Sequence, residues 1–174
     1  MNRRFFSTAA ALAVVTALAV AFAGAAGAKT NRVLAFDVMT PVVAPYTGAT
    51  SPIRGINGGG VPWEIHSGRG WLTAGGSLKV EVEGLVFASN HSNPIGSFKA
   101  VVSCQTIVDG AAQVVNVMTN AFPATTGLAS AGGGNADIEA QVSLPQPCIA
   151  PIIFVTSPGT VTNPIGSWFA ATGF

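Results

Sequence analysis

Two histidines and seven carboxylates are the first candidates for acid–base chemistry in this 174-residue chain. His66 or His91 could act as a general base, but a base needs an orienting carboxylate and a nucleophile beside it. Both histidines adjoin serine and turn residues, and no Gly-x-Ser-x-Gly motif marks a nucleophile. We therefore expect surface histidines. A small secreted hydrolase or metal-binding protein that uses His66 or His91 is the alternative.

Four of the carboxylates form two pairs. Glu81 and Glu83 lie on one face of an alternating segment, as do Asp137 and Glu139, and such spacing permits a glycosidase-like pair. Both pairs alternate with apolar residues, which is typical of the solvated face of a strand. The pattern favours a charged surface, so we predict no catalytic residue and a protein that is not an enzyme.

The two cysteines, Cys104 and Cys148, predict one disulfide, which is the simplest chemistry for two thiols in an exported protein. The bridge would close a loop of about 45 residues and stabilise the fold by about 4 kcal/mol. The alternative is a blue-copper site, whose ligand types are present in a cysteine, His66, His91 and Met118. Such ligands usually crowd one loop, whereas these are spread along the chain. We expect no metal and no cofactor.

Three tryptophans are candidates for an interaction surface. Aromatic rings on a β-sandwich can stack on sugar rings or anchor a protein interface. Trp63, Trp71 and Trp168 are therefore the candidate interaction aromatics, and the expected partner is a protein or a glycan. A tryptophan at an alternating position is more often part of the core, which suits Trp63 and Trp168 better than Trp71, close to Arg69.

The N-terminus predicts export. Arg3 and Arg4 precede an uncharged apolar stretch, residues 9–22, and Ala26-Gly27-Ala28 matches a cleavage site. We interpret residues 1–28 as a helical signal peptide and expect a secreted protein, extracellular or in the cell envelope. The alternative is a retained anchor, because the apolar stretch approaches the roughly 20 residues of a spanning helix. Its small residues favour cleavage, after which we expect no stable membrane insertion.

The charge content excludes some partners. Only 9% of the residues are charged, and 49% are hydrophobic. Without residues 1–28 the chain has six basic and seven acidic residues, a net charge of −1. No Lys/Arg cluster is present to neutralise phosphates, so nucleic-acid binding is disfavoured.

Strands must position these side chains. Polar and apolar residues alternate most clearly in residues 78–83, 97–108 and 136–144, and the mature chain lacks a convincing helical period. Turns are predicted at Ser67-Gly68, and at Gly75-Gly76 and Asp109-Gly110 as two-residue hairpin loops. We predict an all-β fold, an antiparallel β-sandwich or barrel of about eight to nine strands after the signal helix.

One motif occurs twice. Asn93-Pro94-Ile95-Gly96-Ser97-Phe98 returns as Asn163-Pro164-Ile165-Gly166-Ser167-Trp168. Asn, Pro and Gly at these corners favour a type I turn, so each copy predicts a turn followed by a strand, with one copy in each sheet. Residues 29–60 predict a strand and a Gly/Pro-rich loop, which form a single domain with the β-sandwich of residues 61–174.

Several motifs resemble a group of small secreted proteins from actinomycete-type bacteria. These are the LP-x-PC-x-AP signature at residues 144–151 and the motifs at residues 121–125, 134–140 and 168–170. The resemblance covers most of the chain after residue 60. It implies export and a β-rich fold and carries over no catalytic residue.

Together these features favour an exported, non-catalytic β-sandwich protein of the cell envelope or extracellular space. We expect it to be a binding module that interacts through apolar loops at residues 40–60 and 123–135. A secreted enzyme inhibitor that presents a rigid loop is a further alternative.

Overall fold

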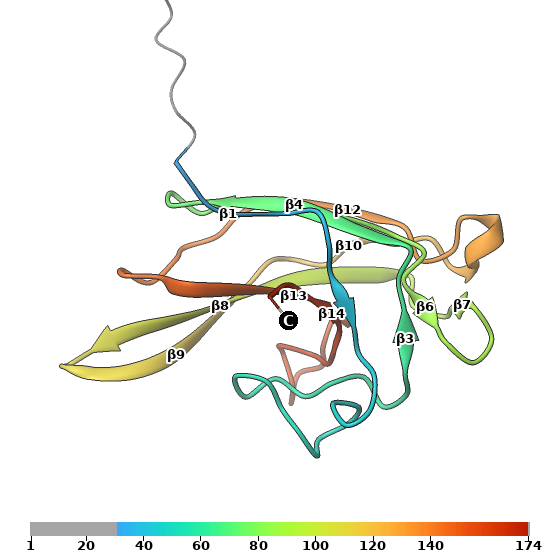
Figure 1. Ribbon diagram of the computed structural model, residues 1–174, viewed down its shortest axis with the longest axis horizontal. Helices are drawn as coiled ribbons and strands as arrows, with labels where there is room; N and C mark the ends of the chain where they lie inside the picture. Colours follow the sequence, from blue (N-terminus) through green and yellow to red (C-terminus); the bar gives the residue numbers. More distant parts are fainter. Residues whose placement is uncertain (1–30, 174) are drawn as a thin grey trace, which may run out of the picture.

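The computed structural model describes residues 31–173, which form two stacked layers of antiparallel strands (Figure 1). The predicted signal peptide lies outside these residues. Within them, eight strands have four residues or more, and the one helical element is the short 3-10 turn η1 (Ala129–Ala131). The predicted all-β fold is confirmed.

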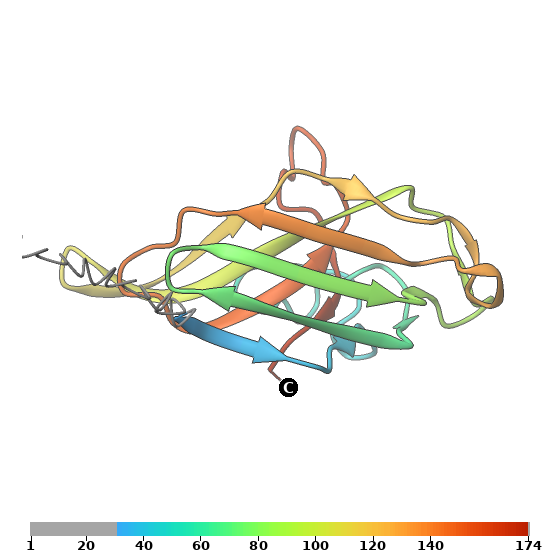
Figure 2. The same cartoon turned by 90° about the horizontal axis from the view of Figure 1, so that it is seen from above.

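The first sheet has the strand order β1-β4-β5-β12 and faces the viewer in Figure 2. Its strands are β1 (Arg32–Phe36), β4 (Ser67–Thr73), β5 (Ser77–Glu83) and β12 (Ala136–Gln141). Because side chains alternate between the faces of a strand, Leu78, Val80 and Val82 of β5 are buried while the intervening charged residues face outward.

The second sheet is built on β8, the longest strand, which pairs with β13 along one edge and with β9 and β10 along the other. Its strands are β2 (Thr40–Pro41), β8 (Ser97–Val108), β9 (Ala111–Met118), β10 (Phe122–Pro123), β13 (Ile149–Thr156) and β14 (Trp168–Ala171). Two short pairs complete the fold: β3 (Trp63–Glu64) with β6 (Val86–Phe87), and β7 (Ser92–Asn93) with β11 (Gly127–Leu128).

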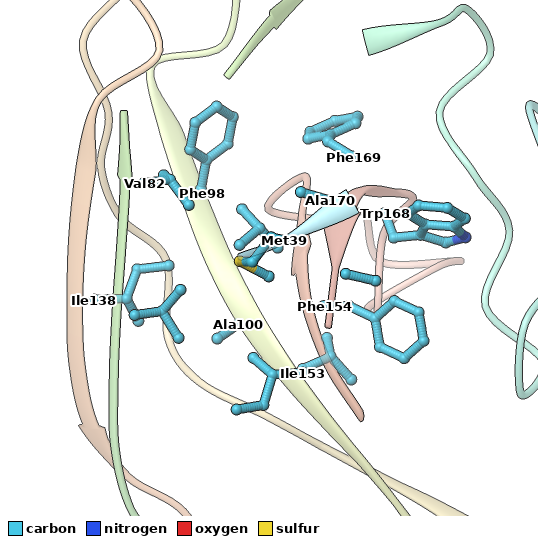
Figure 3. Packing of buried hydrophobic residues seen from close by; sticks show 14 of the residues in the cluster. Met39, Val82, Phe98, Ala100, Ile138, Ile153, Phe154, Trp168, Phe169 and Ala170 are labelled. Atoms are coloured by element: carbon cyan, nitrogen blue, oxygen red, sulfur yellow. The ribbon is translucent and has the colours of Figure 1, made fainter. Parts of the chain in front are cut away.

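The core covers both faces of the second sheet. Val82 and Ile138 of the first sheet belong to the same buried cluster as Ala100 (Figure 3). On the opposite face the aromatic rings of Phe154 and Trp168 pack with their centroids 5.9 Å apart. Residues 43–60 cross this face as an ordered loop (Figure 1), so a segment that reads as a Gly/Pro-rich connection also closes the core.

The disulfide is confirmed. Cys104 of β8 is bonded to Cys148, which precedes β13. The chain has no free cysteine. This contradicts the blue-copper alternative, because neither sulfur is available as a thiolate ligand.

One hairpin turn is confirmed and two turn predictions are wrong in detail. Asp109 and Gly110 form a two-residue loop with φ of 51° and 78°, as a type I′ turn requires. The β4–β5 loop instead has three residues, 74–76, and only Gly76 has a positive φ, at 87°.

Ser67 and Gly68 lie within β4 rather than in a turn. A side chain on Gly68 would come within 2.7 Å of Met39 Cγ, so the glycine serves close packing.

The two motif copies both lead into the second sheet, so the prediction of one copy in each sheet is wrong. In the second copy the Gly166 amide donates to the Asn163 carbonyl at 3.1 Å, which confirms the predicted turn. In the first copy the side chain of Asn93 makes the hydrogen bonds instead. Asn93 is buried, and its amide group donates to the Thr125 carbonyl at 2.8 Å. The same motif therefore serves as a surface turn once and as a buried anchor once.

Candidate functional site

The charged residues gather on or beside the outer face of the first sheet. This surface, the outer-face cluster, holds five of the chain's seven carboxylates. Its members are Arg32, Asp37, Arg69, Lys79, Glu81, Glu83, Asp137 and Glu139. The period-two alternation of β5 and β12 places five of them there, because the intervening apolar residues point into the core. Arg69 joins them because it lies opposite Glu81 on the paired strand β4, and Arg32 and Asp37 come from β1 and the residue after it.

Strand register turns these charges into a network. Glu81 lies opposite both Arg69 of β4 and Asp137 of β12. The Arg69 Nε atom donates to Glu81 Oε2 at 2.5 Å. Lys79 Nζ lies 2.9 Å from Glu81 Oε1 and 2.9 Å from Glu139 Oε1. One network therefore spans three strands, with Glu81 and Lys79 at its centre.

The network fixes the ionisation of its central groups. Hydrogen bonds from Lys79, and then from Arg69, lower the pKa of Glu81. Hydrogen bonds to Glu139 and Glu81 raise the pKa of Lys79, and the bond to Glu81 raises the pKa of Arg69. Glu81 is therefore a stable hydrogen-bond acceptor at neutral pH rather than a proton donor.

An open groove of about 610 Å³ lies over this network. Its lining comes from β1, the residue after it, β4 and β5: Arg32, Ala35, Phe36, Asp37, Arg69, Gly70, Trp71, Lys79 and Glu81. A second hollow of about 480 Å³ shares Arg69 and Glu81 with the groove and extends to Thr125 and Asn135. The two hollows therefore both border on Arg69 and Glu81.

Two aromatic residues line the groove, Phe36, which also packs against the core, and Trp71. The guanidinium carbon of Arg32 lies 5.6 Å from the centroid of the indole ring, which is a cation–π distance. Trp63 and Trp168 are instead 2% and 1% exposed. Trp63 stacks on Phe169 with a centroid distance of 4.0 Å. Of the three candidate interaction aromatics, Trp71 is the one whose side chain is not buried.

Both histidines are exposed, as predicted. His91 Nδ1 lies 2.5 Å from Glu64 Oε1, and its backbone has a left-handed φ of 52°. His66 lines a separate small hollow with Glu64 and Gly84. Among residues 31–173 no group of three or more His, Cys, Asp or Glu side chains is arranged to hold a metal ion.

Sequence reasoning identified the carboxylates but treated them as two separate pairs. The pairing of β5 with β12 brings Glu81 and Asp137 together, and the pairing of β1 with β4 brings Arg32 to Trp71. Arg32 was missed because its position depends on which strands are neighbours. The charged alternation of β5 and β12 was the available signal that these strands share an outer face.

Comparison with family models, with curated proteins and with solved structures finds no match to the chain. The resemblance to secreted actinomycete-type proteins stays a prediction from motifs. In the part of the chain that the structure describes, no helix is both long and apolar enough to cross a membrane.

Proposed function

We propose that this chain is an exported, non-catalytic binding protein of the extracellular space or cell envelope, and that the groove at Trp71 is its ligand site. The observation that carries the proposal is the position of Trp71, on a sheet face, in a groove, among charged donors and acceptors. The signal-peptide motif and the disulfide support export, because disulfides persist in oxidising compartments.

A glycan is the ligand class that best fits this chemistry. A pyranose ring has an apolar face that stacks on an indole, and its rim of hydroxyl groups both donates and accepts hydrogen bonds. Arg69 and Lys79 supply donors, and Glu81 and Asp37 supply acceptors. Because Arg69 and Lys79 are already paired with carboxylates, the groove suits a neutral polyhydroxyl ligand better than an anion.

The site is also preorganised. Trp71, Lys79 and Glu81 are on paired strands, and the ion pairs restrict the side chains of Lys79 and Glu81 before any ligand arrives. Preorganisation lowers the entropy lost on binding. Rigid strands therefore favour this groove over the predicted loops at residues 40–60 and 123–135 as the main binding surface.

Co-sedimentation with insoluble polysaccharides tests the proposal. We would use chitin, cellulose and peptidoglycan as probes and follow tryptophan fluorescence with their soluble oligosaccharides. We expect wild-type protein to bind at least one probe with a change in emission, because Trp71 is the tryptophan at the surface. Trp71→Ala should weaken binding at least tenfold, a loss of about 1.4 kcal/mol.

Val161→Ala is the matched control, because Val161 is fully exposed and does not line the groove. It should bind as the wild type does. Equal binding by Trp71→Ala, or no binding of the wild type to any probe, would show that the groove is not a glycan site.

A small secreted hydrolase is the second candidate, favoured by the 2.5 Å contact between His91 Nδ1 and Glu64 Oε1. A carboxylate and the histidine that it orients are two of the three members of a catalytic triad, and a strained backbone is common at active sites. Hydrolysis of nitrophenyl esters by the wild type, lost in His91→Gln and kept in His66→Gln, would support this function. If the wild type hydrolyses none of these esters, an esterase function is excluded.

A further inference from the structure

The β8–β9 hairpin extends past the body of the sandwich (Figure 1, Figure 2). β9 pairs with β8 from Ala111 to Met118 without a register shift, and among the described residues it has no strand on its other side. The full length of β9 is therefore an open sheet edge.

The turn geometry shows which backbone groups of β9 are open. A two-residue loop makes Val108 and Ala111 a hydrogen-bonded pair, after which bonded and non-bonded pairs alternate along the ladder. The Thr119 amide, which donates to the Ala100 carbonyl at 2.9 Å, continues this alternation. Four residues therefore direct their N–H and C=O groups away from β8: Ala112, Val114, Asn116 and Met118.

The other edges of the two sheets carry the features that prevent edge pairing. β2 and β10 have only two residues each and contain Pro41 and Pro123. β1 has a register irregularity. β12 carries Asp137 and Glu139. β9 has eight residues and contains no charge, no proline and no glycine.

Exposed apolar side chains accompany the open edge. Val114 and Met118 of β9 are 45% and 39% exposed, and Ile107 of β8 is 57% exposed. Burial of such side chains beside a newly formed ladder adds hydrophobic stabilisation to the backbone hydrogen bonds. The β8–β9 hairpin, called the arm below, therefore offers both components of a strand-pairing interface.

We propose that β9 pairs in antiparallel fashion with β9 of a second copy of this chain, about a two-fold axis at Val115. In this register Ala112 faces Met118 of the copy and Val114 faces Asn116 of the copy, so all four outward residues find partners. Self-pairing of a charged strand would place like charges together, but β9 carries none. Because this is the one long unprotected edge among the described strands, the pairing closes at a dimer.

Sedimentation velocity of the oxidised mature protein over a concentration series tests the dimer. We expect the wild-type mass to rise toward twice the monomer mass. Val114→Lys should remain a monomer, because two like charges would meet near the axis. Val161→Lys adds the same charge at a fully exposed position outside the arm and should dimerise as the wild type does. A wild type that stays monomeric throughout, or a Val114→Lys variant that dimerises normally, would overturn the proposal.

Hydrogen exchange of the wild type provides a test that needs no variant. The amides of Ala112, Val114 and Asn116 should exchange rapidly in dilute protein and slow at least tenfold in concentrated protein. The amides of Gln113, Val115 and Val117, which face β8, should be protected at both concentrations. Outward amides that exchange equally fast at both concentrations would exclude pairing through this edge.

Discussion

Arg54 and Ala150 are separated by 96 positions in the chain, and the Arg54 guanidinium donates a 2.7 Å hydrogen bond to the Ala150 carbonyl. A second guanidinium nitrogen donates to the Ser103 carbonyl, also at 2.7 Å. The Arg54 carbonyl accepts from the side chain of Asn116 at 3.1 Å. One loop residue thus ties β13, β8 and β9 together under the second sheet.

Arg54→Ala should lower the free energy of unfolding by about 2 kcal/mol, because hydrogen bonds from a charged donor are lost and two carbonyls lose a partner. Urea denaturation measures this. Arg54→Lys keeps the charge but cannot span both carbonyls, so it should recover less than half of the loss. The loss should also persist in high salt, because the acceptors are neutral. Full recovery by Arg54→Lys would mean that charge alone matters.

The outer-face cluster predicts a dependence of stability on pH. The pKa of Glu81 is lowered from its ordinary value of 4.5 by its hydrogen bonds with Lys79 and Arg69. In the unfolded chain this carboxyl takes up a proton at a higher pH than in the folded chain. Its contribution is therefore complete above pH 4.5 and is lost as the pH falls through the folded-state pKa.

Thermal unfolding at low ionic strength should show this as a Tm that drops below about pH 4.5. Glu81→Gln should flatten the drop. Asp109→Asn removes the same charge in the β8–β9 turn, outside the cluster, and should leave it unchanged. Identical pH profiles of the two variants would contradict this prediction, because the drop in Tm would then depend on net charge rather than on the Glu81 network.

The sequence was sufficient to predict much of the fold. Residues 78–83, 97–108 and 136–144 alternate in polarity, and strands form over 78–83, 97–108 and 136–141. Beyond Gln141 the predicted strand is too long by three residues. β5 and β12 have one covered face, whereas β8 is buried on both faces over most of its length. The predicted turn at Ser67-Gly68 is wrong because a Ser-Gly pair is typical of turns but also suits a strand where packing is close, and Gly68 leaves room for Met39.

The groove could not be predicted in the same way. Trp71 was recognised as the aromatic least suited to the core, but Arg32 reaches it only because β1 pairs with β4. Such pairing joins segments that are distant in the chain, and local alternation carries no information about which strands become neighbours. The ionic network of Glu81 depends on strand order for the same reason.

Two glycines of the β4–β5 hairpin should respond differently to alanine. A Cβ atom on Gly70 would overlap the Lys79 carbonyl oxygen and lie 2.8 Å from Phe36 Cζ. Gly70→Ala should therefore cost about 3 kcal/mol, because the strands must separate. A Cβ on Gly75 would have Thr73 Oγ1 at 3.9 Å as its nearest neighbour, so Gly75→Ala should change stability by less than about 1 kcal/mol. Chemical denaturation of both variants compares them, and equal losses would contradict the close approach at Gly70.

The repeated motif offers a matched pair of substitutions. Asn93 is 1% exposed. Its amide group donates to the carbonyls of Ile95 and Thr125, both at 2.8 Å, and its oxygen accepts from the Ile95 amide at 2.9 Å. Asn163 is exposed, and its side chain only adds a 3.3 Å contact to a Gly166 amide that already bonds to the Asn163 carbonyl.

Asn93→Ala should therefore lower the free energy of unfolding by about 3 kcal/mol, since it leaves buried backbone groups without partners. Asn163→Ala should cost less than about 1 kcal/mol, because water replaces an exposed bond. Urea denaturation of the two variants measures the difference.

Asn93→Asp separates the bonds that the Asn93 side chain donates from the bond that it accepts. The variant keeps the acceptor for the Ile95 amide and loses both donors, so it should be as destabilising as Asn93→Ala or more so. Similar losses for Asn93→Ala and Asn163→Ala would mean that both copies act as simple turns, and that the contact with Thr125 does not fix the start of β8.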